Sequence, residues 1–218
     1  LDATRHMKFP TSGVYAITQT DGKQDDTIVS DTLAALKGGA TVIQYRHKNP
    51  RDSSTLLAQK IHHHCQRFKV PLLINDNIEL AHAIGAEGVH LGQNDASVEK
   101  AQTVLGPNAI IGVSCYDSLD LALKAQKQQA SYVAFGRFFC SETKPKAPPA
   151  QLSTLTQAAQ QLALPIVAIG GILPSNGQLL LNAGADVLAV IGGIFDHDPL
   201  TATQRYCKLF TPADRIPG

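Results

Sequence analysis

The stretch GADVLAVIG, residues 184–192, places a glycine, a small residue and a polar residue directly before a short apolar run. Similar phrases occur as GGATVIQ at 38–44, GAEGVHLG at 85–92 and QASYVAFG at 129–136, the last with Gln129 in place of the glycine. Each is typical of a helix end followed by a buried strand, because glycine accepts the positive φ of a helix C-terminus and continuous apolar runs suit parallel strands. The recurrence indicates a repeated strand–helix unit.

Strand-length apolar runs occur eight times along the chain, and amphipathic segments separate them. We predict strands at Gly13–Thr18, Ala40–Arg46, Pro71–Asp76, Gly88–Gly92, Ile110–Ser114, Tyr132–Gly136, Pro165–Gly171 and Val187–Gly192. We predict helices at Asp31–Lys37, Ser53–Arg67, Ile78–Ile84, Val98–Leu105, Ser118–Gln128, Leu152–Leu162, Gly177–Asn182 and Pro199–Phe210, with Ser53, Ser97, Ser118 and Ser153 as N-caps.

Parallel strands joined by right-handed helical crossovers close naturally into a barrel when there are eight of them. The predicted fold is therefore α/β, a (β/α)₈ TIM barrel forming a single compact domain over residues 7–218. A doubly wound open sheet is the competing fold. Met7 is the only methionine, and we expect residues 1–6 to be an expression-tag remnant.

The composition excludes some function classes. The 218 residues carry 19 basic and 18 acidic side chains, so no global field favours nucleic acid or an anionic membrane. No apolar run is long enough to predict a transmembrane helix. The four cysteines form no C-x-x-C pair, which predicts free thiols and a cytoplasmic protein.

Polar residues gather at the predicted C-terminal strand ends, where barrels of this kind place their active sites. Gln44, Arg46 and Lys48 share one face of the second strand, and two buried cations predict an anionic ligand rather than only a salt-bridged rim. Asp76 and Asp95 follow the third and fourth strands. These carboxylates predict a Mg²⁺ site, with ordinary turn residues as the alternative.

The later strands predict further anion-binding groups. Ser114 ends the fifth strand, and the stretch Ser141–Gln151 after the sixth supplies hydroxyl groups and lysines. A plain polar loop is the alternative there. Glycine pairs end the seventh and eighth strands, which matches the common phosphate site of such barrels. The sequence thus predicts a metal-assisted anion zone and a separate monophosphate zone.

Other motifs carry weaker signals. Consecutive helical residues face different ways, so His62, His63 and His64 predict a solvated helix face rather than a metal site. His90 is interpreted as a packed barrel histidine, and His47 should face away from Arg46. No basic partner marks Cys115 as a nucleophile.

With these residues laid out, the chain resembles the thiamine-phosphate synthase family from about Gly13 to Phe195. The phrases that carry the resemblance are GGATVIQYRHKN, PLLINDNIELAHAIGAEGVHLGQND, IIGVS, YVAFGRFF followed by SETKPKAPP, PIVAIGGI and GADVLAVIGGIF. The resemblance implies a (β/α)₈ enzyme, an alkyl transferase of thiamine biosynthesis. It would couple 4-amino-2-methyl-5-hydroxymethylpyrimidine diphosphate to a thiazole phosphate, or its carboxylated form, giving thiamine phosphate and diphosphate.

The same resemblance assigns roles residue by residue. Arg46, Lys48 and Lys144 would be catalytic, and Asp76 and Asp95 would hold Mg²⁺ as the cofactor. Substrate-binding residues would be Gln44, Tyr45, Arg46, His47, Lys48, Asn75, Ser114, Ser141, Glu142, Thr143, Lys144, Gly171, Ile191 and Gly192. Ligands would be small phosphorylated molecules, without nucleic acid or membrane partners, and homo-oligomerisation is left open.

The chain departs from the family pattern at three places. Ser141 replaces a threonine, Gly192 replaces a serine, and GRFFCS replaces a proline-containing loop, so Arg137 and Cys140 are unusual. Two other functions stay open on these grounds: a thiazole tautomerase of the same fold, and a ligand-sensing barrel without catalysis.

Overall fold

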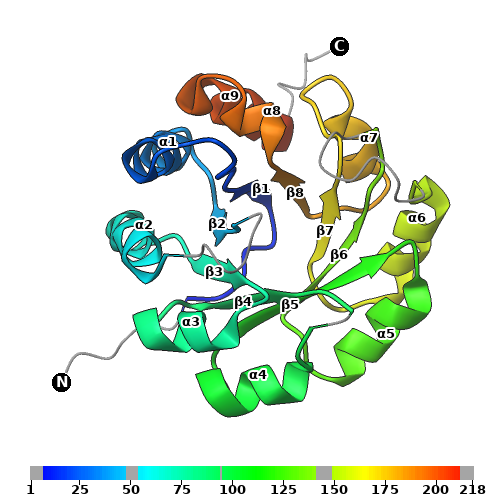
Figure 1. Cartoon of the computed structure of the whole chain (residues 1–218). Coiled ribbons are helices and arrows are strands. Elements are labelled where there is room, and N and C mark those ends of the chain that lie inside the picture. The colour runs from blue at the N-terminus through cyan, green and yellow to red at the C-terminus, as the bar shows by residue number, and fades with distance from the viewer. Residues whose placement is uncertain (1–6, 48–53, 94, 141–148, 212–218) are drawn as a thin grey trace.

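The computed structural model describes residues 7–47, 54–93, 95–140 and 149–211. Eight parallel strands form a closed barrel in chain order, with helices around the outside (Figure 1). The strands are β1 (Gly13–Ile17), β2 (Val42–Tyr45), β3 (Leu72–Asn75), β4 (Gly88–Leu91), β5 (Ile110–Tyr116), β6 (Tyr132–Gly136), β7 (Ile166–Ile169) and β8 (Val187–Val190). Because β1 pairs with β8, the predicted barrel is confirmed and the open-sheet alternative is wrong.

The helices follow the strands along the chain. They are α1 (Asp25–Lys37), α2 (Thr55–Phe68), α3 (Ile78–Ile84), α4 (Val98–Leu105), α5 (Leu119–Lys127), α6 (Leu152–Gln161), α7 (Gly177–Asn182), α8 (Gly192–Phe195) and α9 (Pro199–Cys207), with a 3₁₀ turn η2 (Lys208–Phe210). Within the described ranges, these helices are all too short or too polar to span a bilayer.

Several predicted helix boundaries were wrong for physical reasons. α1 begins at Asp25 rather than Asp31, because the segment before Asp31 also packs on the barrel through buried Ile28, and polar Thr32 lies on the same buried face. The Thr32 hydroxyl is satisfied there by donating to the Ile28 carbonyl at 2.8 Å. Ser54, not Ser53, caps α2.

The other three N-cap predictions were partly confirmed. Ser97 and Ser118 are N-caps as predicted, each accepting a backbone N–H of the first helical turn. Ser153 is not an N-cap, because α6 begins one residue earlier and Gln151 precedes it.

Alternation along the strands divides the core into two layers. One layer lies between the sheet and the helices, and includes Ala16, Ile43 and Tyr45. The other fills the barrel interior, and includes Tyr15 and Tyr132. Residues two apart face the same side of a strand, which places Gln44 with the interior set.

Phe9 closes the N-terminal end of the barrel. Its ring stacks on Tyr132 with a centroid distance of 3.8 Å and meets Tyr15 edge-on at 6.0 Å. Only 8% of Phe9 is exposed. The barrel interior is therefore packed at the N-terminal ends of the strands and open at their C-terminal ends.

The recurrent sequence phrase corresponds to a recurrent hydrogen bond. In three copies, the polar residue before the strand accepts an N–H from the first or second residue of the preceding strand: Glu87 from Leu72 at 2.8 Å, Ser131 from Ile111 at 3.0 Å, and Asp186 from Ile166 at 2.8 Å. In the fourth copy, the Thr41 hydroxyl donates to the Val14 carbonyl at 3.2 Å. Four of the eight neighbouring strand pairs, β1–β2, β3–β4, β5–β6 and β7–β8, are thereby fastened at their N-terminal ends.

His62 corrects the prediction of a solvated histidine face. Its ring is buried, and its Nε2 lies 3.2 Å from the Glu87 carboxylate. The reason is tertiary, because α2 packs this side chain against the segment that precedes β4. His63 is exposed, in keeping with the prediction.

We expect Glu87→Ala to lower the free energy of unfolding by about 2 kcal/mol, because the Leu72 N–H and the His62 ring lose their buried partner. Urea unfolding measures this. Glu87→Gln keeps an acceptor oxygen and should lose less. The exposed Glu99→Ala is the control and should stay within about 0.5 kcal/mol. Equal stability of Glu87→Ala and the wild type would contradict the fastening role.

Candidate active site

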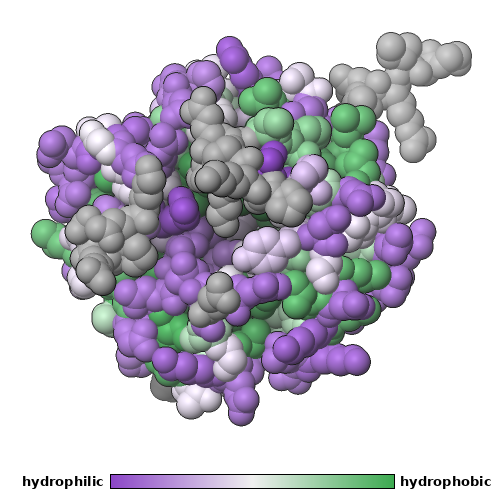
Figure 2. All heavy atoms as spheres, turned by 45° about the vertical axis from the view of Figure 1, so that its right-hand side comes forward, coloured by the Kyte–Doolittle hydropathy of each residue, from purple (hydrophilic) through white to green (hydrophobic). Residues whose placement is uncertain are grey.

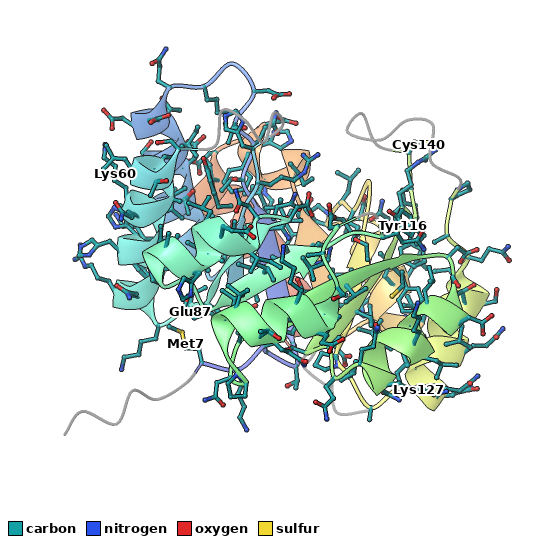
Figure 3. The ribbon with its side chains drawn as sticks, turned by 60° about the horizontal axis from the view of Figure 1, so that its bottom comes forward. Met7, Lys60, Glu87, Tyr116, Lys127 and Cys140 are labelled. Carbon is teal, nitrogen blue, oxygen red and sulfur yellow. The ribbon has the colours of Figure 1, made fainter. Side chains whose placement is uncertain are left out.

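A pocket of about 520 Å³ opens at the C-terminal ends of the strands, and all eight strands contribute to its walls. Figure 2 shows hydrophilic side chains gathered around a hollow near the middle of the view. Figure 3 shows Tyr116 and Cys140, which line the pocket, toward one end of the molecule and Glu87 and Met7 toward the other. The pocket is therefore remote from the strand-fastening hydrogen bonds.

The end of β2 brings Gln44 and Arg46 to the pocket, as predicted. Thr18 holds the Arg46 backbone in place, because its hydroxyl accepts the Arg46 N–H at 3.0 Å and donates to the Arg46 carbonyl at 3.2 Å. Thr18 is only 2% exposed. A guanidinium anchored in this way presents several N–H donors to the pocket.

Tyr45 and His47 are not among the residues that line the pocket. Tyr45 points outward into the layer between sheet and helices, where its hydroxyl accepts the Ser54 N–H at 3.2 Å. Alternation along β2 explains this, because Tyr45 lies between two inward-facing positions. The structure thus separates Tyr45 from the predicted substrate-binding residues that line the pocket.

Asp76 and Asp95 come together at the ends of β3 and β4. Asp76 adopts a left-handed φ of +61° directly after the strand, and the Asn75 amide donates to its carboxylate at 2.6 Å. The Asp95 carboxylate accepts the Gly92 N–H at 2.7 Å. Burial, together with the adjacent Asp95 carboxylate, raises the pKa of Asp76 to about 6, against the lowering effect of Arg46.

This carboxylate pair fits a hard divalent cation. Two close carboxylates repel each other, and a cation between them relieves that repulsion. Mg²⁺ commonly binds one or two carboxylates and completes its shell with water and substrate phosphate oxygens. Among the described residues, no cluster of three or more His, Cys, Asp or Glu side chains offers an all-protein metal site. The two carboxylates therefore suit a Mg²⁺ ion whose remaining ligands would be water and the phosphate oxygens of a bound substrate.

The glycine pairs after β7 and β8 line the opposite part of the pocket. Gly171 has a φ of +64°, and a Cβ there would lie 2.3 Å from the Cys140 carbonyl oxygen. A Cβ at Gly170 would lie 2.3 Å from the Arg137 Cβ. Glycine is thus needed to seat the chain that follows β6, which also donates the Phe139 N–H to the Gly170 carbonyl at 3.0 Å.

Gly192 has a different reason to lack a side chain. A Cβ there would lie 2.3 Å from the Asp196 carboxylate, which lines the same part of the pocket. The serine usual in the family would not fit beside this side chain as it stands. Asp196 is exposed, so a phosphate contact at Gly192 requires its carboxylate to turn outward.

The interior below the pocket contains polar residues that the sequence analysis did not single out. Tyr15 and Tyr132 face inward, and their hydroxyl groups lie 2.9 Å apart. His90 is packed in the barrel as predicted, yet it also lines the pocket. Alternation within the first and sixth strands was the available signal for the two tyrosines.

Asn75, Ser114 and Ile191 also line the pocket. Arg137, an unusual residue in the sequence, lies there too, and its guanidinium donates to the Phe139 carbonyl at 3.3 Å. The predicted site residues Lys48, Ser141, Glu142, Thr143 and Lys144 lie outside the described residues.

Comparison with known proteins places this pocket in a family. A family model described as thiamine monophosphate synthase matches residues 14–194. The chain belongs to this family. The thiamine-phosphate synthase of Marinobacter nauticus is 50% identical over 188 residues, covering 86% of this chain and 84% of that protein. The thiamine-phosphate synthase of Methylococcus capsulatus is 45% identical over 215 residues, covering 97% and 96%.

Solved structures agree with this assignment. The thiamine phosphate pyrophosphorylase of Pyrococcus furiosus superposes with a TM-score of 0.81 at 32% identity, covering 91% of this chain and 95% of that one. A 3-hexulose-6-phosphate synthase superposes with a TM-score of 0.67 at 16% identity and shares the fold alone. The chain is accordingly an enzyme of the thiamine-phosphate synthase family, a transferase.

Proposed function

We propose that this pocket couples an aminopyrimidine methyl diphosphate to a thiazole phosphate and releases thiamine phosphate and diphosphate. One observation carries the proposal. A single pocket receives Arg46 and a pair of carboxylates on one side and two glycine pairs on the other. Its volume of about 520 Å³ is in the range of sites for small organic ligands.

The diphosphate is assigned to the Arg46 side of the pocket. The C–O bond between the pyrimidine methylene and the diphosphate breaks, and the electron pair leaves with the diphosphate. Arg46 stabilises this developing negative charge, and Lys48 and Lys144 are assigned the same role from the resemblance. Asp76 and Asp95 would hold Mg²⁺, which supplies further charge neutralisation at the leaving group when bound.

The pyrimidine ring is assigned to Gln44, Asn75 and Ser114 at the pocket floor. The thiazole phosphate is assigned to the backbone of Gly171, Ile191 and Gly192, because glycine lets N–H groups approach an anion closely. The thiazole nitrogen then forms the new C–N bond to the pyrimidine methylene. No proton transfer is needed in this step, so positioning of the two substrates contributes much of the rate.

One assay tests the proposal against its alternatives. The protein is mixed with both substrates and Mg²⁺, and the products are followed by mass spectrometry. We expect thiamine phosphate and diphosphate in equal amounts. Conversion of the thiazole phosphate alone, without Mg²⁺ or pyrimidine, would instead support a tautomerase. Binding of both substrates without any product would support a ligand-sensing barrel.

Arg46→Ala should lower kcat/KM about 100-fold, because the leaving diphosphate loses a positioned cation. Arg46→Lys keeps the charge but loses the planar fork, so a smaller loss of about tenfold is expected. Steady-state kinetics with the pyrimidine substrate varied measures both. Arg67→Ala, at an exposed position on α2, is the control and should behave as the wild type. Unchanged kinetics of Arg46→Ala would show that the diphosphate does not bind on this side of the pocket.

A further inference from the structure

A continuous chain of hydrogen bonds crosses the barrel interior below the pocket. The Gln44 amide nitrogen lies 2.6 Å from the Tyr15 hydroxyl, which lies 2.9 Å from the Tyr132 hydroxyl. The Tyr132 hydroxyl lies 2.8 Å from His90 Nδ1, and His90 Nε2 lies 2.9 Å from the Ser114 hydroxyl. The chain therefore joins two pocket-lining residues, Gln44 and Ser114, that come from different sides of the barrel.

The hydrogens along this chain are not independent of one another. Tyr15 and Tyr132 are 1% and 0% exposed, and burial raises the pKa of both hydroxyls, so each keeps its single proton. An amide nitrogen only donates, and a tyrosine hydroxyl donates one hydrogen. Since Gln44 donates to Tyr15, the Tyr15 hydrogen goes to Tyr132 and the Tyr132 hydrogen goes to His90.

This order fixes the state of the histidine. His90 Nδ1 must accept, so its proton resides on Nε2 and is donated to the Ser114 oxygen. A proton on Nδ1 would point toward Tyr132 and force that hydroxyl to donate back to Tyr15. Tyr15 would then receive two hydrogens, and neither of the described residues bonded to its hydroxyl, Gln44 and Tyr132, would accept its own hydrogen, which is costly for a buried hydroxyl.

We propose that His90 is a positioning residue, held as the neutral Nε2–H tautomer by a hydrogen-bond chain that runs in one direction from Gln44 to Ser114. In this direction the Ser114 hydroxyl has its hydrogen left to donate into the pocket. The Gln44 amide keeps its carbonyl oxygen as an acceptor there. The two residues are thus set as one donor and one acceptor by the hydrogen-bonded groups of the barrel interior that connect them.

A ligand that matches this pattern donates to Gln44 and accepts from Ser114. An aminopyrimidine has an amino group as donor and ring nitrogens as acceptors, so it fits the pattern. This consequence rests on the proposed function, whereas the tautomer of His90 does not. The two are therefore tested separately.

The tautomer is measured directly on the whole protein. Long-range ¹H–¹⁵N correlation spectra at about pH 7 distinguish the two neutral tautomers and the imidazolium, and His90→Gln identifies the His90 signals among the eight histidines. We expect a single Nε2–H population for His90. An Nδ1–H population, an imidazolium or a mixture in the wild type would overturn the proposal.

A variant tests the origin of the tautomer. Tyr132→Phe removes the donor to Nδ1, so we expect the Nδ1–H form to appear alongside the other. Tyr206→Phe is the matched control. Tyr206 is equally buried, but its hydroxyl donates to the Ile172 carbonyl and takes no part in the hydrogen-bond chain from Gln44 to Ser114. Its His90 signals should equal those of the wild type. Wild-type signals in a folded Tyr132→Phe would overturn the proposed direction.

Ligand binding tests the consequence at the pocket. We expect Tyr132→Phe to weaken binding of 4-amino-2-methyl-5-hydroxymethylpyrimidine about tenfold, the effect of one disturbed hydrogen bond. Binding of inorganic diphosphate should change less than about twofold, because the chain lies under the ring site. Equal weakening of both probes would overturn the positioning role. If wild type with the expected tautomer failed to bind the pyrimidine, the proposed function would be contradicted and the direction of the chain retained.

Discussion

Asp76→Asn is expected to lower kcat/KM for thiamine phosphate formation by about 100-fold or more, because it removes one charge of the carboxylate pair proposed to hold Mg²⁺. Asparagine is the suitable replacement, because Asp76 has a φ of +61° and asparagine tolerates the left-handed region better than alanine. The size and shape of the side chain are also kept. The measurement is steady-state turnover at increasing Mg²⁺ concentration.

Two comparisons separate a metal-binding role from a general effect of lost charge. Asp95→Asn should show a similar loss, and both variants should need more Mg²⁺ for half of their maximal rate. Asp26→Asn changes a carboxylate that is 92% exposed on α1 and should leave the kinetics unchanged. Near-normal turnover of Asp76→Asn at the Mg²⁺ concentration that suits the wild type would show that this carboxylate does not hold the ion.

Gly112→Ala is expected to lower the free energy of unfolding by about 3 kcal/mol. A Cβ at Gly112 would lie 1.9 Å from Cζ of Tyr132. That ring has no room to move, since it stacks on Phe9 and its hydroxyl is bonded to Tyr15 and His90. Overpacking an interior that is fixed on several sides forces strain into the barrel. Urea unfolding and the Tm measure the loss.

Gly22→Ala supplies the comparison for this variant. Gly22 has a φ of +69°, and no atom lies within 4 Å of the Cβ position. The cost there is only the backbone preference, about 1 kcal/mol. A larger loss at Gly112 than at Gly22 would show that contact with Tyr132, rather than the loss of a glycine, causes the destabilisation. Equal losses would contradict the packed interior.

The sequence was sufficient to predict the barrel and the part of the site that contains Arg46, Asp76 and Asp95. The recurring helix-end and strand phrase predicted eight parallel strands, because buried parallel strands leave a continuous apolar pattern in the sequence. Arg46, Asp76 and Asp95 follow strand ends, and in a parallel barrel all such ends meet at one mouth. Their convergence on one pocket could therefore be predicted without coordinates.

The direction of single side chains needed more than the pattern. Tyr45 was grouped with its neighbours in the sequence, but alternation turns it away from the pocket. His62 was assigned to a solvated face, but helix packing places it against Glu87. For Tyr45 the alternation along β2 was a local signal, whereas the contact that buries His62 comes from another element, which a local pattern does not contain.

Sequence by itself determined the fold and the set of residues at the strand ends, because both follow from local periodicity and from the shared direction of the strands. Only the tertiary structure decided which polar groups meet inside the barrel. Tyr15 and Tyr132 are 117 positions apart, and closure of β8 onto β1 together with the strand register brings their hydroxyls to 2.9 Å. Hydrogen bonds depend on such distances to within a few tenths of an ångström, and those distances are set by the closed barrel as a whole.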